Sequence, residues 1–68
     1  MTKERFDNLL EILLDAQPFR PFAVERIGGR KFEVDSPRSV AFRDGVAVFM
    51  PARGGPIPFD HNDLVDPN

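Results

Sequence analysis

Cysteine, tryptophan and tyrosine are absent from this sequence of 68 residues, and histidine occurs only once. Without cysteine the chain has no disulfide, and one histidine is too few for a structural zinc site built from nitrogen and sulfur ligands. A cysteine-free chain is typical of a reducing compartment. We therefore expect no metal and no other cofactor.

Long apolar runs are also missing. No segment approaches the roughly 18 apolar residues of a membrane-spanning helix, and the N terminus lacks the charged and apolar regions of a secretory signal. We expect a soluble, cytoplasmic protein with no membrane partner. Seven phenylalanines and a hydrophobic content of 41% favour a folded core over disorder.

Catalytic patterns are scarce as well. The two serines, Ser36 and Ser39, are not flanked by the glycines of a nucleophile elbow, and His61 is the single imidazole base. Gly28-Gly29-Arg30 lacks the full glycine pattern of a phosphate-binding loop. A domain this small also has little volume for a substrate cleft of a few hundred Å³. We predict that the protein is not an enzyme and has no catalytic or cofactor-binding residues.

One acidic cluster near the C terminus raises the question of a metal. Asp60, His61 and Asp63 lie within a few residues of one another, but their spacing defines no ligand geometry. A turn formed by Asp60 or Asn62 in a solvated acidic segment is the simpler interpretation. We therefore predict no metal-binding residues.

Residues 3–16 have the pattern of an amphipathic helix. Its apolar residues recur at helical spacing, at Phe6, Leu9, Leu10 and Leu13. Thr2 is placed to cap the N terminus. Pro18 ends the helix, because proline disfavours helical geometry in the residue before it.

Two further apolar residues, Ile12 and Leu14, make the apolar stripe of this helix wider than a surface helix needs. Either the helix is buried on two sides, or it contacts a partner as well as its own core. We predict that Ile12 and Leu14 bind a partner.

The remaining sequence predicts short antiparallel strands joined by turns, placed at about 22–27, 30–35, 39–43, 46–50 and 59–65. Gly28-Gly29 is a two-residue hairpin signal, and Arg43-Asp44-Gly45 holds a second hairpin turn. Residues 51–58 form a loop rich in proline and glycine.

The predicted fold is a single α+β domain over residues 1–68, with an N-terminal helix followed by a bent antiparallel sheet of four or five short strands. Such a sheet curls into a small SH3/Sm-like open barrel or lies under the helix. The predicted core takes one apolar face from each element, namely Phe6, Leu9, Leu10, Leu13, Phe22, Val24, Phe32, Val34, Val40, Val46, Val48 and Leu64. Ile27 has the opposite phase to Val24 and is expected at the rim.

Positive charge is concentrated in the middle of the chain, between two acidic ends. Residues 18–53 carry six arginines and one lysine, although the net charge of the whole chain is −2. RNA or DNA binding is therefore the alternative function, through Arg20, Arg26, Arg30, Lys31, Arg38, Arg43 and Arg53. Nucleic-acid binders also use exposed aromatic rings, whereas these phenylalanines mostly occupy core positions.

The stretch "PFRPF" at residues 18–22 has two interpretations. Its Pro-x-x-Pro spacing is found in ligands of aromatic grooves. The favoured alternative is a rigid joint, in which the prolines fix the backbone and Phe19 and Phe22 enter the core.

The longer run "PFRPFAVERIGGRKFEVDSP" resembles a family of small uncharacterised bacterial proteins, well represented in planctomycetes. In these a helix is followed by "RPFRPF", a strand, a glycine-containing hairpin and a His-Pro or Ser-Pro bend. The matching residues are Pro18, Phe19, Arg20, Pro21, Phe22, Gly29, Arg30, Phe32, Val34 and Pro37. The resemblance implies a shape but no activity. The order of the elements is also similar to that of Sm-like and SH3-like small barrels.

Small size points to association. A single small core rarely supplies more than about 3–5 kcal/mol, and this chain has no disulfide or metal to add to it. We expect a binding or assembly module whose partner is another protein or a second copy of the chain. The helix face at Ile12 and Leu14 is favoured over a sheet edge, because Pro18 and Pro21 block the start of the first strand from donating hydrogen bonds.

Overall fold

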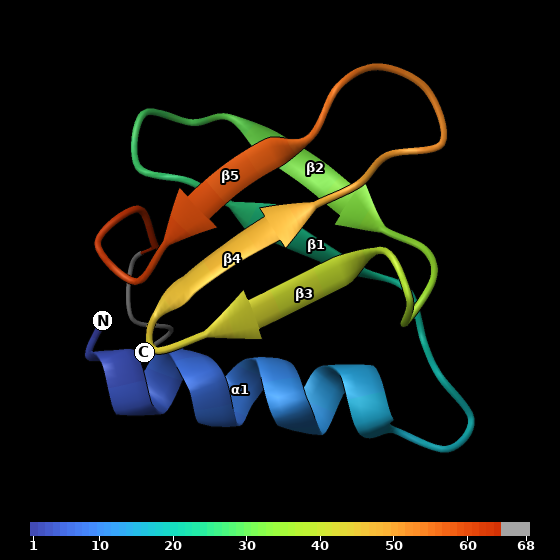
Figure 1. The fold of residues 1–68 in the computed structure, drawn as a ribbon, viewed down its shortest axis with the longest axis horizontal. Coiled ribbons are helices and arrows are strands. Elements are labelled where there is room, and N and C mark those ends of the chain that lie inside the picture. The colour runs from blue at the N-terminus through green and yellow to red at the C-terminus, as the bar shows by residue number, and fades with distance from the viewer. Residues whose placement is uncertain (65–68) are drawn as a thin grey trace.

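One helix and five short strands make up the computed structural model, which describes residues 1–64 (Figure 1). The elements are α1 (Lys3–Asp15), β1 (Phe22–Glu25), β2 (Lys31–Val34), β3 (Val40–Arg43), β4 (Val46–Phe49) and β5 (Ile57–Asp60). The first two strands form an antiparallel pair, and the other three form an antiparallel sheet in the order β3-β4-β5. The predicted α+β class is confirmed.

The strands form two sheets that do not close into a barrel. Between β2 and β3 the chain makes a bend, in which Ser36 O accepts hydrogen bonds from Ser39 N at 3.2 Å and from Ser39 Oγ at 2.7 Å. This bend carries the chain from one sheet to the other, so β2 and β3 do not pair. In Figure 1 the three-stranded sheet lies in front of the two-stranded sheet, and α1 runs beside β3.

The helix begins where the sequence predicts. Thr2 has extended backbone geometry, and its Oγ1 accepts a hydrogen bond from Arg5 N at 3.1 Å, as an N-cap does. The helix ends at Asp15, one residue earlier than predicted. Phe6 and Leu10 are buried on its inner face. No helix within residues 1–64 is long and apolar enough to cross a membrane.

The two hairpins differ in loop length. Asp44 and Gly45 have φ angles of 52° and 81° and form a two-residue loop between the paired Arg43 and Val46, which is the geometry of a type I′ turn. The β1–β2 loop is longer than predicted, because Arg26 N donates to Arg30 O at 2.7 Å and leaves three residues at the tip. The first two strands are therefore shorter than the sequence predicts.

Within residues 1–64 the buried core is made by eight apolar residues: Phe6, Leu10, Val24, Val34, Val40, Ala47, Phe49 and Phe59. The predicted inward phase of β4 is wrong. The two-residue turn sets the register Val40↔Phe49 and Phe42↔Ala47, and residues opposite each other in a pair share a face of the sheet. Val46 and Val48 therefore point outward, and Val46 is 56% exposed.

Five other predicted core residues are not fully buried, and Phe22, Phe32 and Leu64 among them pack against the core. Leu9, Leu13, Phe22, Phe32 and Leu64 are each half-buried. Ile27, expected at a rim, is 65% exposed at the tip of the β1–β2 hairpin.

An aromatic cluster fills the centre of the molecule. The rings of Phe32 and Phe49 stack with centroids 4.7 Å apart, and Phe59 meets Phe32 at 5.3 Å and Phe6 at 5.7 Å edge to face. These are favourable geometries for aromatic pairs. Phe59 reaches the cluster because β5 begins at Ile57, inside the predicted loop, and a turn rather than a strand follows it. The predicted end of this strand, at residue 65, lies outside the described residues.

The "PFRPF" stretch agrees with the joint interpretation. Phe19 and Phe22 pack against the core, with ring centroids 6.2 Å apart. Pro18 and Pro21 are exposed, and the peptide bond before Pro18 is cis. The stretch therefore anchors the connection between α1 and β1 by its two aromatic rings.

Candidate functional site

The two predicted partner-binding residues lie in different environments. Ile12 is 68% exposed on the solvent side of α1. Leu14 is half-buried and packs against the core. It lies four residues after the buried Leu10 and so extends the same face of the helix. The structure therefore does not bring Ile12 and Leu14 together on one surface.

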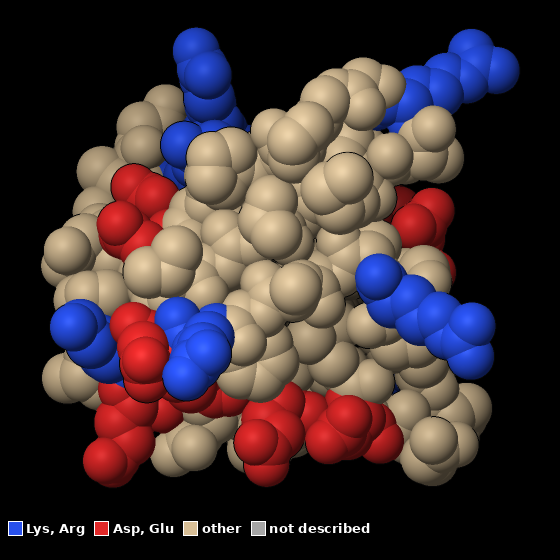
Figure 2. All heavy atoms as spheres, viewed as in Figure 1, with Lys and Arg blue, Asp and Glu red and all other residues tan. Residues whose placement is uncertain are grey.

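The predicted nucleic-acid residues are distributed over the molecule. Arg20 lies in the connection after α1, and the β1–β2 hairpin carries Arg26, Arg30 and Lys31. Arg38 lies in the bend before β3, Arg43 at the end of β3 and Arg53 in the loop before β5. On the face of the molecule that Figure 2 shows, the Lys and Arg side chains form separate groups near the rim, with neutral atoms between them. This face offers no continuous basic surface for a phosphate backbone.

The acidic cluster near the C terminus forms a turn. Asp60 Oδ1 accepts from Asn62 N at 2.8 Å, and Asp63 Oδ2 accepts from Asp60 N at 2.9 Å. His61 Nδ1 lies 2.8 Å from the carbonyl oxygen of Met1. Within residues 1–64 no three His, Asp or Glu side chains are grouped so that they could hold a metal ion.

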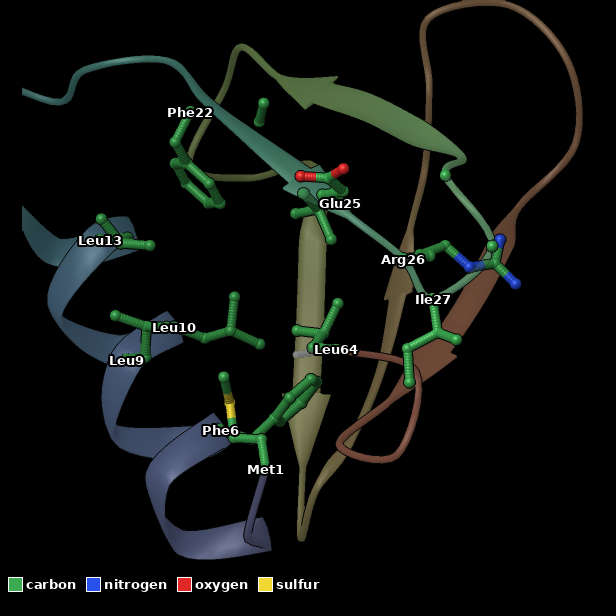
Figure 3. A pocket seen from close by; sticks show the side chains of 14 residues that line it. Met1, Phe6, Leu9, Leu10, Leu13, Phe22, Glu25, Arg26, Ile27 and Leu64 are labelled. Atoms are coloured by element: carbon green, nitrogen blue, oxygen red, sulfur yellow. The ribbon is translucent and has the colours of Figure 1, made fainter. Parts of the chain in front are cut away.

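An apolar groove lies between α1 and β1 in the described part of the chain (Figure 3). Its volume is about 610 Å³, within the range of ligand-binding sites, so the expectation that a domain this small has little volume for a cleft of a few hundred Å³ is wrong. Side chains from one side of α1 form one wall, namely Phe6, Leu9, Leu10 and Leu13. Residues of β1 and its hairpin loop form the other wall, and Met1 and Leu64 close one end. We call this hollow the α1–β1 groove.

Charge is confined to one wall of the α1–β1 groove. Its charged lining residues are Glu25 and Arg26, which are adjacent on β1 and its continuation. Glu25 is exposed and Arg26 is half-buried. In Figure 3 the guanidinium of Arg26 points away from the helix, whereas Leu10 extends from α1 into the hollow. A ligand in this groove would therefore meet mainly hydrocarbon.

The wall formed by β1 is also the edge of a sheet. β1 pairs only with β2 among the strands of residues 1–64. Because Arg26 N bonds to Arg30 O in the β2 direction, alternate residues Val24 and Phe22 also direct their backbone groups toward β2. Ala23 and Glu25 direct theirs to the other side, along the groove.

The chain itself pairs with the far end of this edge. Ile27 N donates to Asp63 O at 2.7 Å, and Arg26 forms an antiparallel bridge with Leu64. Leu64 is half-buried and lines the α1–β1 groove. At Ala23, however, no strand within residues 1–64 pairs with the edge. The edge therefore accepts antiparallel pairing and is only partly occupied.

A second surface lies on the outer side of the three-stranded sheet. Val46 and Met50 are 56% and 54% exposed there, and Val48 lies between them on the same strand face. In the view of Figure 2 the middle of this face carries neutral atoms, and charged side chains surround it. We call this surface the outer sheet face.

Sequence reasoning missed both surfaces, although it singled out some of their residues. Leu9, Leu13 and Phe22 were assigned to the core; all three line the groove, and Phe22 also packs against the core. The signal was the wide apolar stripe of α1, in which Leu9 and Leu13 remain only half-buried. For the outer sheet face the signal was the run "VAVFM" at residues 46–50, which is apolar in both strand phases.

Comparisons with known proteins add no relative. The chain matches no protein-family model, and neither curated proteins nor solved structures include a similar one. The resemblance of residues 18–37 to small bacterial proteins thus stays a prediction.

Proposed function

We propose that this protein is a non-enzymatic docking module that binds an extended segment of another protein in the α1–β1 groove. The observation that carries the proposal is the coincidence of an unpaired strand edge at Ala23 with an apolar wall on α1. Backbone hydrogen bonds to an exposed edge supply affinity in this mode of recognition, and pockets for alternate side chains supply specificity.

The free edge defines the backbone of the partner. An incoming strand meets the N–H and C=O of Ala23, which face away from β2. Pro21 has no N–H to offer, so the pairing is limited to a few residues. The bound segment is therefore short and extended, and it runs antiparallel to β1, as residues 63–64 do at the far end of the same edge.

The apolar wall defines the side chains of the partner. Leu64 is paired with Arg26 and turns its side chain into the groove. Because side chains alternate along a strand, a partner residue opposite Val24 or Phe22 would point to the same side, toward Leu9 and Leu13. We infer that the recognised segment has apolar side chains at alternate positions.

Nucleic-acid binding has less support. The basic residues seen in Figure 2 are separated, and Arg43 lies next to Asp44, with Nε 3.9 Å from Oδ2. Salt distinguishes the two functions, because the release of counterions makes nucleic-acid affinity fall steeply as salt is added.

A cysteine-free chain also suits a reducing setting such as the cytoplasm.

A phage-displayed library of random peptides, selected against the intact protein, tests the proposal. We expect enriched peptides with apolar residues at every second position. On titration with such a peptide, the amide NMR signals of Ala23 and Glu25 and the methyl signals of Leu9 and Leu13 should shift most. Enriched peptides that shift only signals far from the groove would contradict the proposal, as would the absence of any enrichment.

A further inference from the structure

The outer sheet face has a pattern of charge that matches its own copy. β4 is the middle strand, and Ala47 and Phe49 face the core. Val46 and Val48 therefore form an apolar ridge on the outer side. Cross-strand register places Ala41 and Pro58 on either side of Val48, which gives one uncharged row across the sheet.

The neighbouring row carries opposite charges at its two ends. Arg43 on β3 and Asp60 on β5 both pair with Val46. The row therefore reads cation, apolar residue, carboxylate across the three strands. Arg43 has 93% of its side chain exposed. Asp60 uses Oδ1 to accept from Asn62 N, and a carboxylate has further lone pairs to offer.

We propose that the outer sheet face binds a second copy of the chain, with the two sheets packed face to face about a two-fold axis along β4. This rotation lays β4 on β4 and exchanges the sides of β3 and β5. Val46 and Val48 then meet the same residues of the second copy, and Arg43 lies opposite Asp60 of the second copy. A two-fold interface must be self-complementary in this way.

The charge pattern of the outer sheet face favours a second copy over an unrelated protein. A partner with a different charge pattern would leave Arg43 or Asp60 opposite a neutral or like-charged group, and like charges across an interface are costly. The contact that Arg43 makes in its own chain, to Asp44 at 3.9 Å, is between side chains 93% and 86% exposed. Such surface pairs contribute only about 0–1 kcal/mol, so Arg43 can exchange that contact for one across the interface.

This inference is independent of the α1–β1 groove, which lies against the other sheet. A protein that binds no peptide can still dimerise through β3-β4-β5, and a monomer can still bind a peptide. The two proposals therefore succeed or fail separately.

Sedimentation equilibrium with two charge variants gives the decisive test. Arg43→Glu places two acidic pairs across the two-fold axis, and Asp60→Lys places two basic pairs. Each variant alone should dimerise at least about tenfold more weakly than the wild type, which corresponds to about 1.4 kcal/mol. An equal mixture should form a heterodimer of near wild-type affinity, because each interface position then holds one cation and one carboxylate.

A second comparison does not depend on the turn that Asp60 caps. Val46→Lys replaces an apolar residue at the centre of the face, and Ile12→Lys replaces one of similar exposure on α1. Val46→Lys should abolish the dimer and Ile12→Lys should leave it intact. A wild type that stays monomeric at millimolar concentration would overturn the inference, as would a mixture of folded charge variants that fails to associate or a dimer that tolerates Val46→Lys.

Discussion

The backbone N–H of Gly45 donates a hydrogen bond of 2.9 Å to Oδ1 of Asp7. This bond joins the β3–β4 turn to the first half of α1, across 38 positions of sequence. The carbonyl of the same glycine accepts from His61 N at 2.8 Å. Gly45 thus links α1, the β3–β4 turn and the turn after β5. These hydrogen bonds hold α1, one wall of the α1–β1 groove, in place against the sheets.

Replacing Gly45 with alanine should destabilise the protein strongly. An added Cβ would lie 2.6 Å from Lys3 Cγ and 2.9 Å from Cδ2 of His61, and the φ angle of 81° is one that other residues rarely adopt. The left-handed geometry alone costs about 1–2 kcal/mol, so the loss in free energy of unfolding should exceed about 2 kcal/mol. Gly29→Ala is the matched control, because Gly29 has a φ angle of 88° and open space around it. Equal losses in urea denaturation would show that the close approach at Gly45 has no energetic effect.

Removing the acceptor at Asp7 should loosen the same joint. Asp7→Ala leaves the partly buried N–H of Gly45 without its partner, which costs about 1–3 kcal/mol. Asp7→Asn retains a side-chain oxygen and should cost less. The free energies of unfolding of both variants, measured by urea denaturation, check this order. An alanine variant as stable as the asparagine variant would contradict it.

Phe49, the last residue of β4, and Met50, which follows it, test the register of the three-stranded sheet. Phe49 is buried and stacked on Phe32, whereas Met50 is 54% exposed. Truncating a buried phenylalanine to alanine costs about 3–5 kcal/mol, which equals the whole stability expected of so small a core. Phe49→Ala should therefore be largely unfolded by circular dichroism at a dilution where the protein is monomeric. Met50→Ala should change stability by less than about 0.5 kcal/mol. The reverse order would restore the phase that the sequence predicts.

Much of the fold could be predicted because its signals are local. Thr2 as a cap, Pro18 beyond the helix end and Asp44-Gly45 as a hairpin turn each depend on a few neighbouring residues. The phase of β4 could not be predicted from its own residues, since "VAVF" is apolar on both faces. It followed from the turn, whose two-residue loop aligns Ala47 with Phe42.

The candidate site was less predictable than the fold. Whether Leu13 is buried in the core or lines a groove depends on the distance between α1 and β1, and that distance is a property of tertiary packing. Helical spacing alone could have predicted that Leu14 is more buried than Ile12, because Leu14 follows the core residue Leu10 by four residues and lies on the same face of the helix. Treating the two as one surface overlooked that spacing.

Leu13 and Ile12 are neighbours in α1 but lie on different faces of the helix, so substitutions at these two positions distinguish the groove from the solvent face. Leu13 lines the groove and Ile12 is 68% exposed. Leu13→Asn should weaken the binding of a selected peptide at least about tenfold, because about 1.4 kcal/mol of apolar contact is lost. Ile12→Asn should leave that affinity unchanged in fluorescence polarisation. The opposite result would return the binding surface to the helix face that the sequence predicts.

The most direct measurement of the central claim is the affinity of a selected peptide for Ala23→Pro. Proline removes the N–H that faces the groove, and it leaves the β1–β2 hydrogen bonds in place because Ala23 does not direct its backbone toward β2. We predict a loss of affinity of at least about tenfold, the equivalent of one hydrogen bond of about 1.4 kcal/mol, with thermal stability nearly unchanged. A folded Ala23→Pro variant that binds the peptide as tightly as the wild type would contradict the claim that partners pair with the edge of β1.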